Sequence, residues 1–507
     1  MHSGDVLVEP APAAMRAALE AAPARVASWT VTLAGLDLRD VRREARRRIT
    51  ETDQDRPFVV TGHQPEFIHP GVWAKHVVAS RLAEAVGGVA VNLTVDTDVA
   101  KTTALSVPML TDGGLRVHAM QFADVAPGTT YEDIPPLDGA HVARLRESVR
   151  QALGERFGRS MMGPYLERFG SLDGPSSFVD QATAARSSLE SEFGVRMLET
   201  RVSRSWICPL LVDILGNAPR LFESYNASLA EYRGAQGIRG SQRPIPDLIR
   251  DGDRLELPLW VRHTHEPRSR LFVEQRRDTL FLYADQQSVG CIGLDKLATW
   301  DRALKALREL DGVLFRPRAL MLTLWARMLL ADLFVHGIGG AKYDRITDRL
   351  IERYFGVQPP VMACVSATLR LDLPRHDATP DVLRALKHQQ RDLTWNPQRH
   401  LSAGSGIDEL VEARAKAVGQ SRSLRATNGR RRAERREVFH QIRSISRRML
   451  DLRPAAERDL EERVRQTTEG LRDNEAADRR DYFFALYERS ALQRLCDTLP
   501  AVEEFRV

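Results

Sequence analysis

The chain has 507 residues with 73 basic and 68 acidic side chains, and this near balance does not indicate a nucleic-acid partner for the whole chain. Its length predicts two or three domains with a large core. Its four cysteines stand far apart with no CxxC pair, which argues against a zinc ribbon and a disulfide framework.

The N-terminal quarter predicts a helical arm followed by a βαβ unit. Residues 1–55 are rich in alanine and arginine and are expected to form a peripheral helical arm. Residues 57–60 predict a strand, and apolar residues then recur at helical spacing between positions 73 and 85. The β-branched run of residues 89–95 predicts a second strand, buried on both faces as in a parallel sheet.

The middle of the chain predicts a Rossmann-like α/β core over residues 56–375. Short β-rich segments at about residues 240–295 predict a small antiparallel insertion in it. The apolar window 319–335 contains Arg327 and Asp332, so it favours one buried core helix over a membrane span. Because the N-terminus also lacks the pattern of a secretory signal, a cytoplasmic protein without membrane segments is expected.

The C-terminal part, residues 376–507, has long and highly charged helical patterns, the last of them over residues 480–499. Its apolar stripe is too narrow for a separate globular core, which predicts a coiled-coil arm that forms a homodimer. The arginine run of residues 430–448 is interrupted by Glu434 and Glu437 and contains almost no aromatic residues. It is interpreted as a solvated helix face, and binding to nucleic acid is not expected.

The turn after the first predicted strand is the first candidate site. Ligands of open α/β sheets bind where strands end and helices begin. The turn has a glycine for close backbone approach, histidines for proton transfer and an amide, and a lysine follows for an anionic group. These candidates are Thr61, Gly62, His63, Gln64, His69 and Lys75, with His63 assigned to catalysis. The alternative is that His63 and His69 only cap the turn.

Acidic residues follow the second predicted strand. Asp96 and Asp98 are candidates for catalysis, and Lys101 is a candidate for ligand binding. In the functional interpretation one carboxylate holds an amine, a ribose hydroxyl or a divalent cation. In the alternative, Asp98 caps the next element.

Two further segments were considered for ligands. Gly339, Gly340 and Lys342 lie in a turn whose backbone can approach a phosphate, although a helix C-cap with a tight turn is the alternative. His263 and His265 alternate along a probable hairpin, but no third ligand is identifiable, so no metal site is assigned.

These features, in this order, resemble the bacillithiol-biosynthesis cysteine-adding enzymes, usually named BshC. The resemblance covers most of the chain: the Thr61-Gly62-His63-Gln64 turn, Lys75, the strand that ends at Asp96-Thr97-Asp98, the Gly339-Gly340 turn and the charged helical C-terminus. The family has Gln where this chain has His63, a histidine in its acidic cluster, and Pro-Gly where this chain has Ala341-Lys342. The string His63-Gln64-Pro65 also resembles WbqC-like proteins linked to polysaccharide biosynthesis, over that one turn.

The resemblance implies a Rossmann-like core related to class I aminoacyl-tRNA synthetases, a connecting insertion and a dimerising coiled coil. It also implies a ligase of thiol biosynthesis that joins cysteine or a similar carboxylate to an amine-bearing acceptor such as an amino-sugar conjugate. ATP or ADP is the possible cofactor, bound in the core cleft. The alternatives are a nucleotidyl- or sugar-related transferase at the same cleft, and a non-catalytic binding protein with a helical dimerisation arm.

Overall fold

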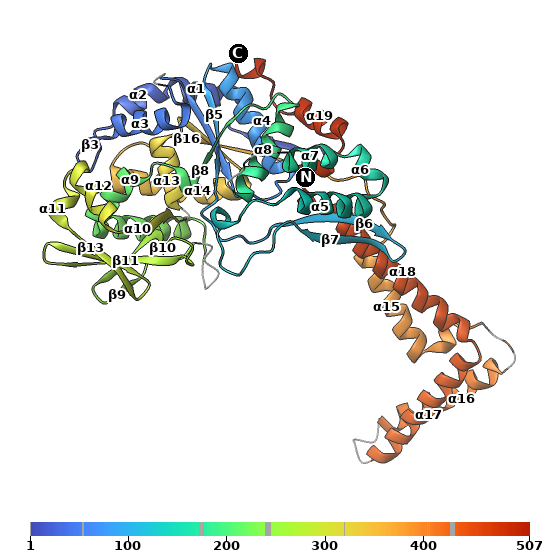
Figure 1. The fold of residues 1–507 in the computed structure, drawn as a ribbon. Coiled ribbons are helices and arrows are strands. Elements are labelled where there is room, and N and C mark those ends of the chain that lie inside the picture. Colours follow the sequence, from blue (N-terminus) through green and yellow to red (C-terminus); the bar gives the residue numbers. More distant parts are fainter. Residues whose placement is uncertain are drawn as a thin grey trace. The chain divides into compact units, whose positions relative to one another are not determined.

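The computed structural model describes residues 2–52, 55–171, 174, 177–238, 245–318, 320–402, 404, 406–425 and 431–506. The fold is mixed α/β, as predicted, and it divides into two compact units (Figure 1). The first unit comprises Met1–Val107, His118–Leu371 and Arg480–Val507, and the second comprises Pro108–Val117 and Asp372–Arg479. Within the described residues, no helix has the length and apolar composition needed to cross a membrane.

The first unit is built on a sheet in which all strands but one are parallel. Its strands in spatial order are β1 (Val6–Glu9), β16 (Val361–Ala367), β15 (Leu333–His336), β4 (Phe58–His63), β5 (Val89–Thr94) and β8 (Leu198–Arg201), with β1 antiparallel to β16. The chain extends from β4 to β5 and β8 on one side and then returns to β15 and β16 on the other. The strand order therefore reverses between β4 and β15, which is where open α/β sheets bind ligands at the carboxyl ends of their strands.

The two faces of this sheet differ in character. Val60 and Leu93 face a large apolar core formed with α3 (Leu38–Thr50), α9 (Cys208–Gly216), α10 (Ala218–Ala235), α13 (Leu320–Leu329) and α14 (Ile338–Phe355). Because side chains alternate along a strand, residues 59, 61 and 63 point to the opposite face. There α4 (Pro70–Ala85) packs on β4, β5 and β16.

The remaining helices and short strands of the first unit complete its layers. The helices are α1 (Pro12–Glu20), α2 (Ala22–Ala27), α5 (Gly139–Leu153), α6 (Glu155–Arg159), α7 (Met162–Gly170), α8 (Phe178–Ser191), α11 (Leu294–Leu297), α12 (Trp300–Glu309) and α19 (Arg489–Thr498). A two-stranded ribbon is formed by β2 (Thr32–Leu33) and β3 (Leu36–Asp37). Another hairpin is formed by β6 (Ala104–Thr111) and β7 (Gly114–Gln121), whose tip belongs to the second unit.

An antiparallel sheet forms at the predicted insertion. It contains β9 (Arg250–Asp251), β10 (Arg254–His263), β11 (Ser269–Arg276), β12 (Thr279–Ala284) and β13 (Gln287–Gly293). It is completed by β14 (Val313–Pro317), which pairs with β10. This sheet thus extends beyond the predicted limit near residue 295.

Two predicted helices were wrong in extent. Residues 319–335 were expected to form one helix, but α13 ends at Leu329 and Leu333 begins strand β15. A continuous apolar run is compatible with a buried helix and with a buried parallel strand, so the periodicity could not indicate where the helix ends and the strand begins. Residues 480–499 were expected to be helical throughout, but only α19 is an α-helix, and the aromatic side chains of Tyr482 and Phe484 before it are fully buried.

The second unit is largely helical, in agreement with the predicted patterns. It contains α15 (Pro380–Trp395), α16 (Ile407–Arg425), α17 (Arg432–Asp451) and α18 (Pro454–Asp478). The most extensive helix contacts pair α15 with α18 and α16 with α17. Of the arginine run, Arg430 lies outside the described residues, whereas Arg447 and Arg448 are exposed on α17.

Candidate functional site at the carboxyl edge of the parallel sheet

Polar side chains form two rows on the face of the sheet that α4 covers. In the strand register, Thr61, Asn92 and Glu199 lie side by side, and His63, Thr94 and Arg201 form the next row toward the carboxyl edge. Six polar positions on adjacent strands of a buried sheet are unusual, because buried polar groups destabilise a core unless they find partners. The rows place the predicted turn at one end of a larger polar site.

Gly62 faces the opposite side, against strand β5. A methyl group at this position would approach the carbonyl oxygen of Leu93 to 2.9 Å and its Cβ to 3.2 Å. The neighbouring strand therefore requires glycine here, independently of any ligand. Substitution of Gly62 would report on folding first, so a different glycine is needed to test ligand binding.

Lys75 connects α4 to the end of β4. Its Nζ donates a hydrogen bond of 2.9 Å to the carbonyl oxygen of Gly62, and the side chain is buried. Burial lowers the pKa of Lys75 to about 8, and the charge of Arg186 lowers it further. A methyl group placed on Gly337 would lie 3.9 Å from Lys75 Cδ, so this lysine lies between the ends of β4 and β15.

His63 is held neutral by its surroundings. Burial lowers the pKa of His63 to about 3, and the nearby charge of Lys75 acts in the same direction. Its Nδ1 is 3.0 Å from the carbonyl oxygen of Gln64. The side chain lines a cavity of about 20 Å³ together with Gln64, Asn92 and Thr94. A neutral imidazole at a strand end offers one hydrogen-bond donor and one acceptor to a bound group.

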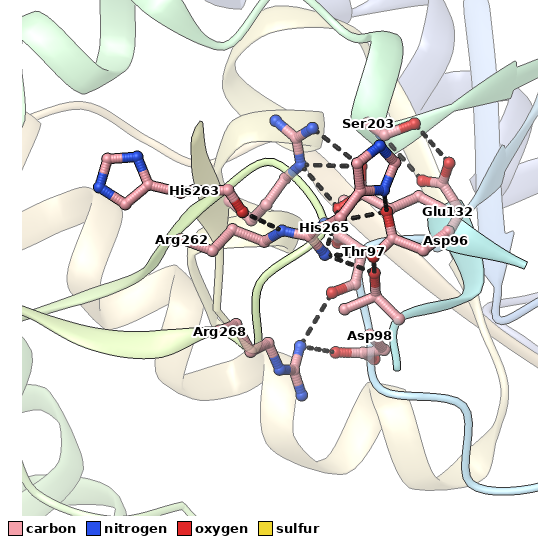
Figure 2. A network of polar contacts seen from close by, with 12 residues as sticks. Asp96, Thr97, Asp98, Glu132, Ser203, Arg262, His263, His265 and Arg268 are labelled. Carbon is pink, nitrogen blue, oxygen red and sulfur yellow. Dashed lines mark hydrogen bonds and ion pairs between the residues drawn. The ribbon is translucent and has the colours of Figure 1, made fainter. Parts of the chain in front are cut away.

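Asp96 is fully buried and tied to the end of β8. It accepts hydrogen bonds from Arg201 Nε at 2.6 Å and from the backbone N–H of Ser203 at 2.9 Å, and the hydroxyl of Ser203 also donates to it (Figure 2). These contacts suit a carboxylate that positions Arg201.

Asp98 joins the loop after β5 to the antiparallel sheet. It accepts a 3.0 Å hydrogen bond from Gln64 Nε2 and forms an ion pair with Arg268 at 2.9 Å (Figure 2). Arg268 also donates a hydrogen bond to the carbonyl oxygen of Thr97. The guanidinium of Arg268 in turn lies 4.4 Å from the centre of the Trp260 ring. Gln64 and Asp98, predicted from separate segments, are thus in direct contact.

Other predicted candidates have different surroundings. His69 is the N-cap of α4 and accepts a hydrogen bond from the backbone N–H of Gly71 at 3.0 Å. This contact is the capping role considered above for the turn histidines. Lys101 is exposed and lies in the loop before β6.

Gly339, Gly340 and Lys342 lie in the first turns of α14, immediately after β15, so they follow a strand and not the predicted helix. The N-cap of α14 is Gly337, and no side chain of the described residues caps its first amides. A methyl group on Gly340 would meet Nδ1 of His336 at 2.7 Å, whereas one on Gly339 would meet nothing within 4 Å. Free amides at a helix N-terminus favour an anion.

The imidazole of His336 is fixed beneath this helix start. Its Nε2 lies 2.8 Å from Asp344 Oδ2, and Arg327 donates to the same oxygen at 2.8 Å. Burial alone would raise the pKa of Asp344, but the charge of Arg327 and the hydrogen bond with His336 lower it below its ordinary value. The start of α14 is therefore held by a buried network.

The polar residues on the covered face of the sheet were missed in the sequence. They include Asn92, Thr94, Glu199 and Arg201, together with His76 on α4 and Arg186 and Glu190 on α8. Asn92 and Thr94 alternate within an otherwise apolar strand, and this period of two was a signal that could have located the polar face. No local pattern connects α8 with α4, because they lie about 100 residues apart.

The two histidines of the hairpin have different surroundings. The side chain of His265 is 79% exposed and its Nδ1 lies 3.4 Å from Asp133 Oδ1, whereas His263 points away from this network (Figure 2). Among the described residues, no group of three or more histidine, cysteine, aspartate or glutamate side chains has the arrangement needed to hold a metal ion.

Comparison with known proteins adds no assignment. No protein-family model matches the sequence, and no curated protein matches it either.

Proposed function

We propose that this chain is an enzyme that joins a carboxylate, such as that of cysteine or a similar amino acid, to an amine-bearing acceptor, with a nucleotide in the core cleft. The parallel strands follow the spatial order β8, β5, β4, β15, β16, which matches the 3-2-1-4-5 order of Rossmann-type nucleotide-binding sheets. The loops after β4 and β5 meet through Gln64 and Asp98, beside the reversal of that order between β4 and β15. This convergence is the observation that carries the proposal.

The nucleotide phosphates are assigned to the start of α14. Its first amides are uncapped, Gly339 leaves room for close approach, and Lys75 places a cation behind the adjoining strand ends. The neutral His63 and the pair formed by Gln64 and Asp98 lie at the next strand ends, where the reacting carboxylate and amine would meet. Asp96 then orients Arg201 toward the same edge.

Gly339→Ala tests the phosphate assignment. The open space around Gly339 means that alanine should leave the melting temperature of the free protein nearly unchanged. If phosphates lie against this backbone, nucleotide affinity should fall by about 10-fold or more, which corresponds to about 1.4 kcal/mol. Isothermal titration with ATP and ADP, and melting curves with and without nucleotide, measure both quantities.

The matched control is Gly234→Ala on α10, a helical glycine that also has nothing within 4 Å. It should bind nucleotide like the natural chain. Equal affinity in both variants would move the phosphates away from α14. The absence of any melting shift with ATP, ADP, cysteine or amino sugars would instead favour a non-catalytic protein.

The second unit is proposed to form the homodimer contact. Trp395 and Phe439 are 42% and 47% exposed, their ring centroids lie 6.1 Å apart, and Arg443 stacks on the indole at 4.2 Å. Exposed aromatic side chains of this kind are enriched at protein interfaces.

Light scattering should therefore give the mass of a dimer, and the double change Trp395→Ser, Phe439→Ser should give a monomer with unchanged helix content. A monomer of the natural chain at micromolar concentration would contradict the dimer.

A further inference from the structure

Two residues that line a small cavity on the covered face of the sheet, His76 and Asn92, each have a buried polar atom without a hydrogen-bond partner among the described residues. The cavity of about 20 Å³ is lined by residues from β4, β5, α4 and α8, and its lining includes His76 and Asn92. The side chains of His76 and Asn92 are almost fully buried, with 1% and 3% exposure. His76 Nε2 and Asn92 Oδ1 are buried without a hydrogen-bond partner among the described residues. Buried polar atoms without partners destabilise a fold, so a bound group that donates hydrogen bonds to both atoms would be stabilising.

The contacts of His76 determine the role of its Nε2. The Nδ1 atom lies 2.7 Å from Oε1 of Glu190 and 3.2 Å from Nη1 of Arg186, so its shorter contact is the one to the carboxylate. Burial alone would raise the pKa of Glu190, but the charge of Arg186 and the hydrogen bond with His76 lower it, so Glu190 is a carboxylate that only accepts hydrogen bonds. The proton of a neutral imidazole is therefore on Nδ1, and Nε2 presents a lone pair.

The contacts of Asn92 determine its orientation in the same way. Its Nδ2 donates to Oε2 of Glu199 at 2.8 Å, so the amide oxygen is the atom that remains unpartnered. Arg186 forms ion pairs with both carboxylates, at 2.7 Å with Glu190 and at 2.8 Å with Glu199. One arginine thus fixes both the imidazole and the amide as acceptors.

Two acceptors select a group that has at least two hydrogens to donate. A primary amine and a water molecule both satisfy this, and a cavity of about 20 Å³ admits one such group. A wider pocket of about 560 Å³ shares Thr94 and Thr183 with the cavity, and hydroxyl and charged groups of Asp180, Ser187 and Arg201 line it. This pocket suits the polar body of a hydroxyl-rich molecule whose amine enters the cavity.

We propose that the cavity seats the attacking nitrogen of the acceptor and that His76, oriented by Glu190, is the catalytic general base that receives its proton. This inference rests on the proposed ligase function and adds the place of the attacking amine and the residue that receives its proton. A water molecule in the same place would lead to hydrolysis of the activated carboxylate.

In the proposed step, a carboxylate that a nucleoside triphosphate has activated, as an acyl phosphate or acyl adenylate, presents its carbonyl carbon to the nitrogen. The C–N bond forms and the C–O bond to the phosphate breaks, and the phosphate leaves with the bonding electron pair. The nitrogen loses one proton to Nε2 of His76, while Asn92 Oδ1 keeps its hydrogen bond to a remaining N–H.

Hydroxylamine is the probe for the cavity, because it is small, uncharged at neutral pH and carries hydrogens to donate. The buried proton between His76 and Glu190 should give a downfield ¹H NMR resonance that His76→Gln removes. Hydroxylamine should shift this resonance in the natural chain and leave it unchanged in Asn92→Leu, which keeps the His76–Glu190 pair but removes one acceptor. The matched control, the His336–Asp344 proton, should not respond.

If hydroxylamine leaves the resonance unchanged while ATP still raises the melting temperature, this inference is overturned and the proposed function stands. If ATP has no effect but hydroxylamine shifts the resonance, the nucleotide proposal fails and the amine site stands.

In turnover, His76→Gln should lower amide formation by about 100-fold or more with nucleotide affinity changed less than about 3-fold. A loss below about 10-fold would exclude His76 as the base. Mass spectrometry distinguishes the coupled product from the hydrolysed one.

Discussion

Replacing Asp332 with alanine is expected to destabilise the first unit by about 3–5 kcal/mol, because it leaves buried arginine charge without its counterion. The carboxylate pairs with Arg42 at 2.8 Å and Arg46 at 2.7 Å, and it accepts the backbone N–H of Phe58 at 2.8 Å. Burial lowers the pKa of Arg42 to about 9, with a further contribution from Arg46, so this guanidinium depends on its partner. Denaturant unfolding measures the loss.

The matched control is Asp40→Ala on α3, the helix that carries Arg42 and Arg46. Asp40 forms an ion pair with Arg43 in which both side chains are 67% exposed. Such exposed pairs contribute little, so the midpoint of unfolding should hardly change. Similar losses of unfolding free energy in the two variants would contradict this prediction. They would show that the ion pairs of Asp332 with Arg42 and Arg46 do not hold α3 against the starts of β4 and β15.

His63 is expected to make stability depend on acidic pH. In the folded chain its pKa is about 3, lowered from 6.5 first by burial and then by Lys75. Between these values the unfolded chain binds a proton that the folded chain excludes, so stability falls as the pH decreases from 6.5 toward 3. At pH 5 the free energy of unfolding is lower than at neutral pH by about 2 kcal/mol. Over the whole range from pH 6.5 to pH 3 the decrease reaches about 4 kcal/mol.

His63→Asn should remove this part of the pH dependence. Comparing the unfolding free energies of both chains at pH 7 and pH 5 isolates His63, because the other histidines are common to both. His265→Asn, whose side chain is 79% exposed in the natural chain, serves as the control and should retain the full dependence. An equal loss of stability in the natural chain and in His63→Asn would mean that His63 is protonated in the fold.

The position of His63 also links the two proposals. A histidine that stays neutral at pH 5 does not compete with Lys75 for an anion, and it lines the same cavity as His76. Proton transfer to His76 would thus take place beside a second uncharged imidazole.

Local sequence patterns were sufficient for the elements nearest the candidate site. The strand β4, the helix α4 and the strand β5 followed from apolar spacing, and the helices of the second unit followed from their charged amphipathic patterns, since both depend on neighbours within one or two turns. The predicted βαβ unit is also compatible with two contacts of the site, Gln64 with Asp98 and Lys75 with Gly62. The carboxyl ends of parallel strands lie at the same edge of a sheet, which brings these residues near one another.

Only the tertiary structure decided the rest. Whether residues 333–336 form a strand depends on pairing with β4 and β16, which lie far away in the sequence. The placement of α3 likewise depends on Arg42 meeting Asp332 about 290 positions later. The acceptor pair of His76 and Asn92 is fixed by Glu190 and Glu199 through Arg186. No local periodicity encodes these contacts, because burial and the pairing of charges across distant segments select them.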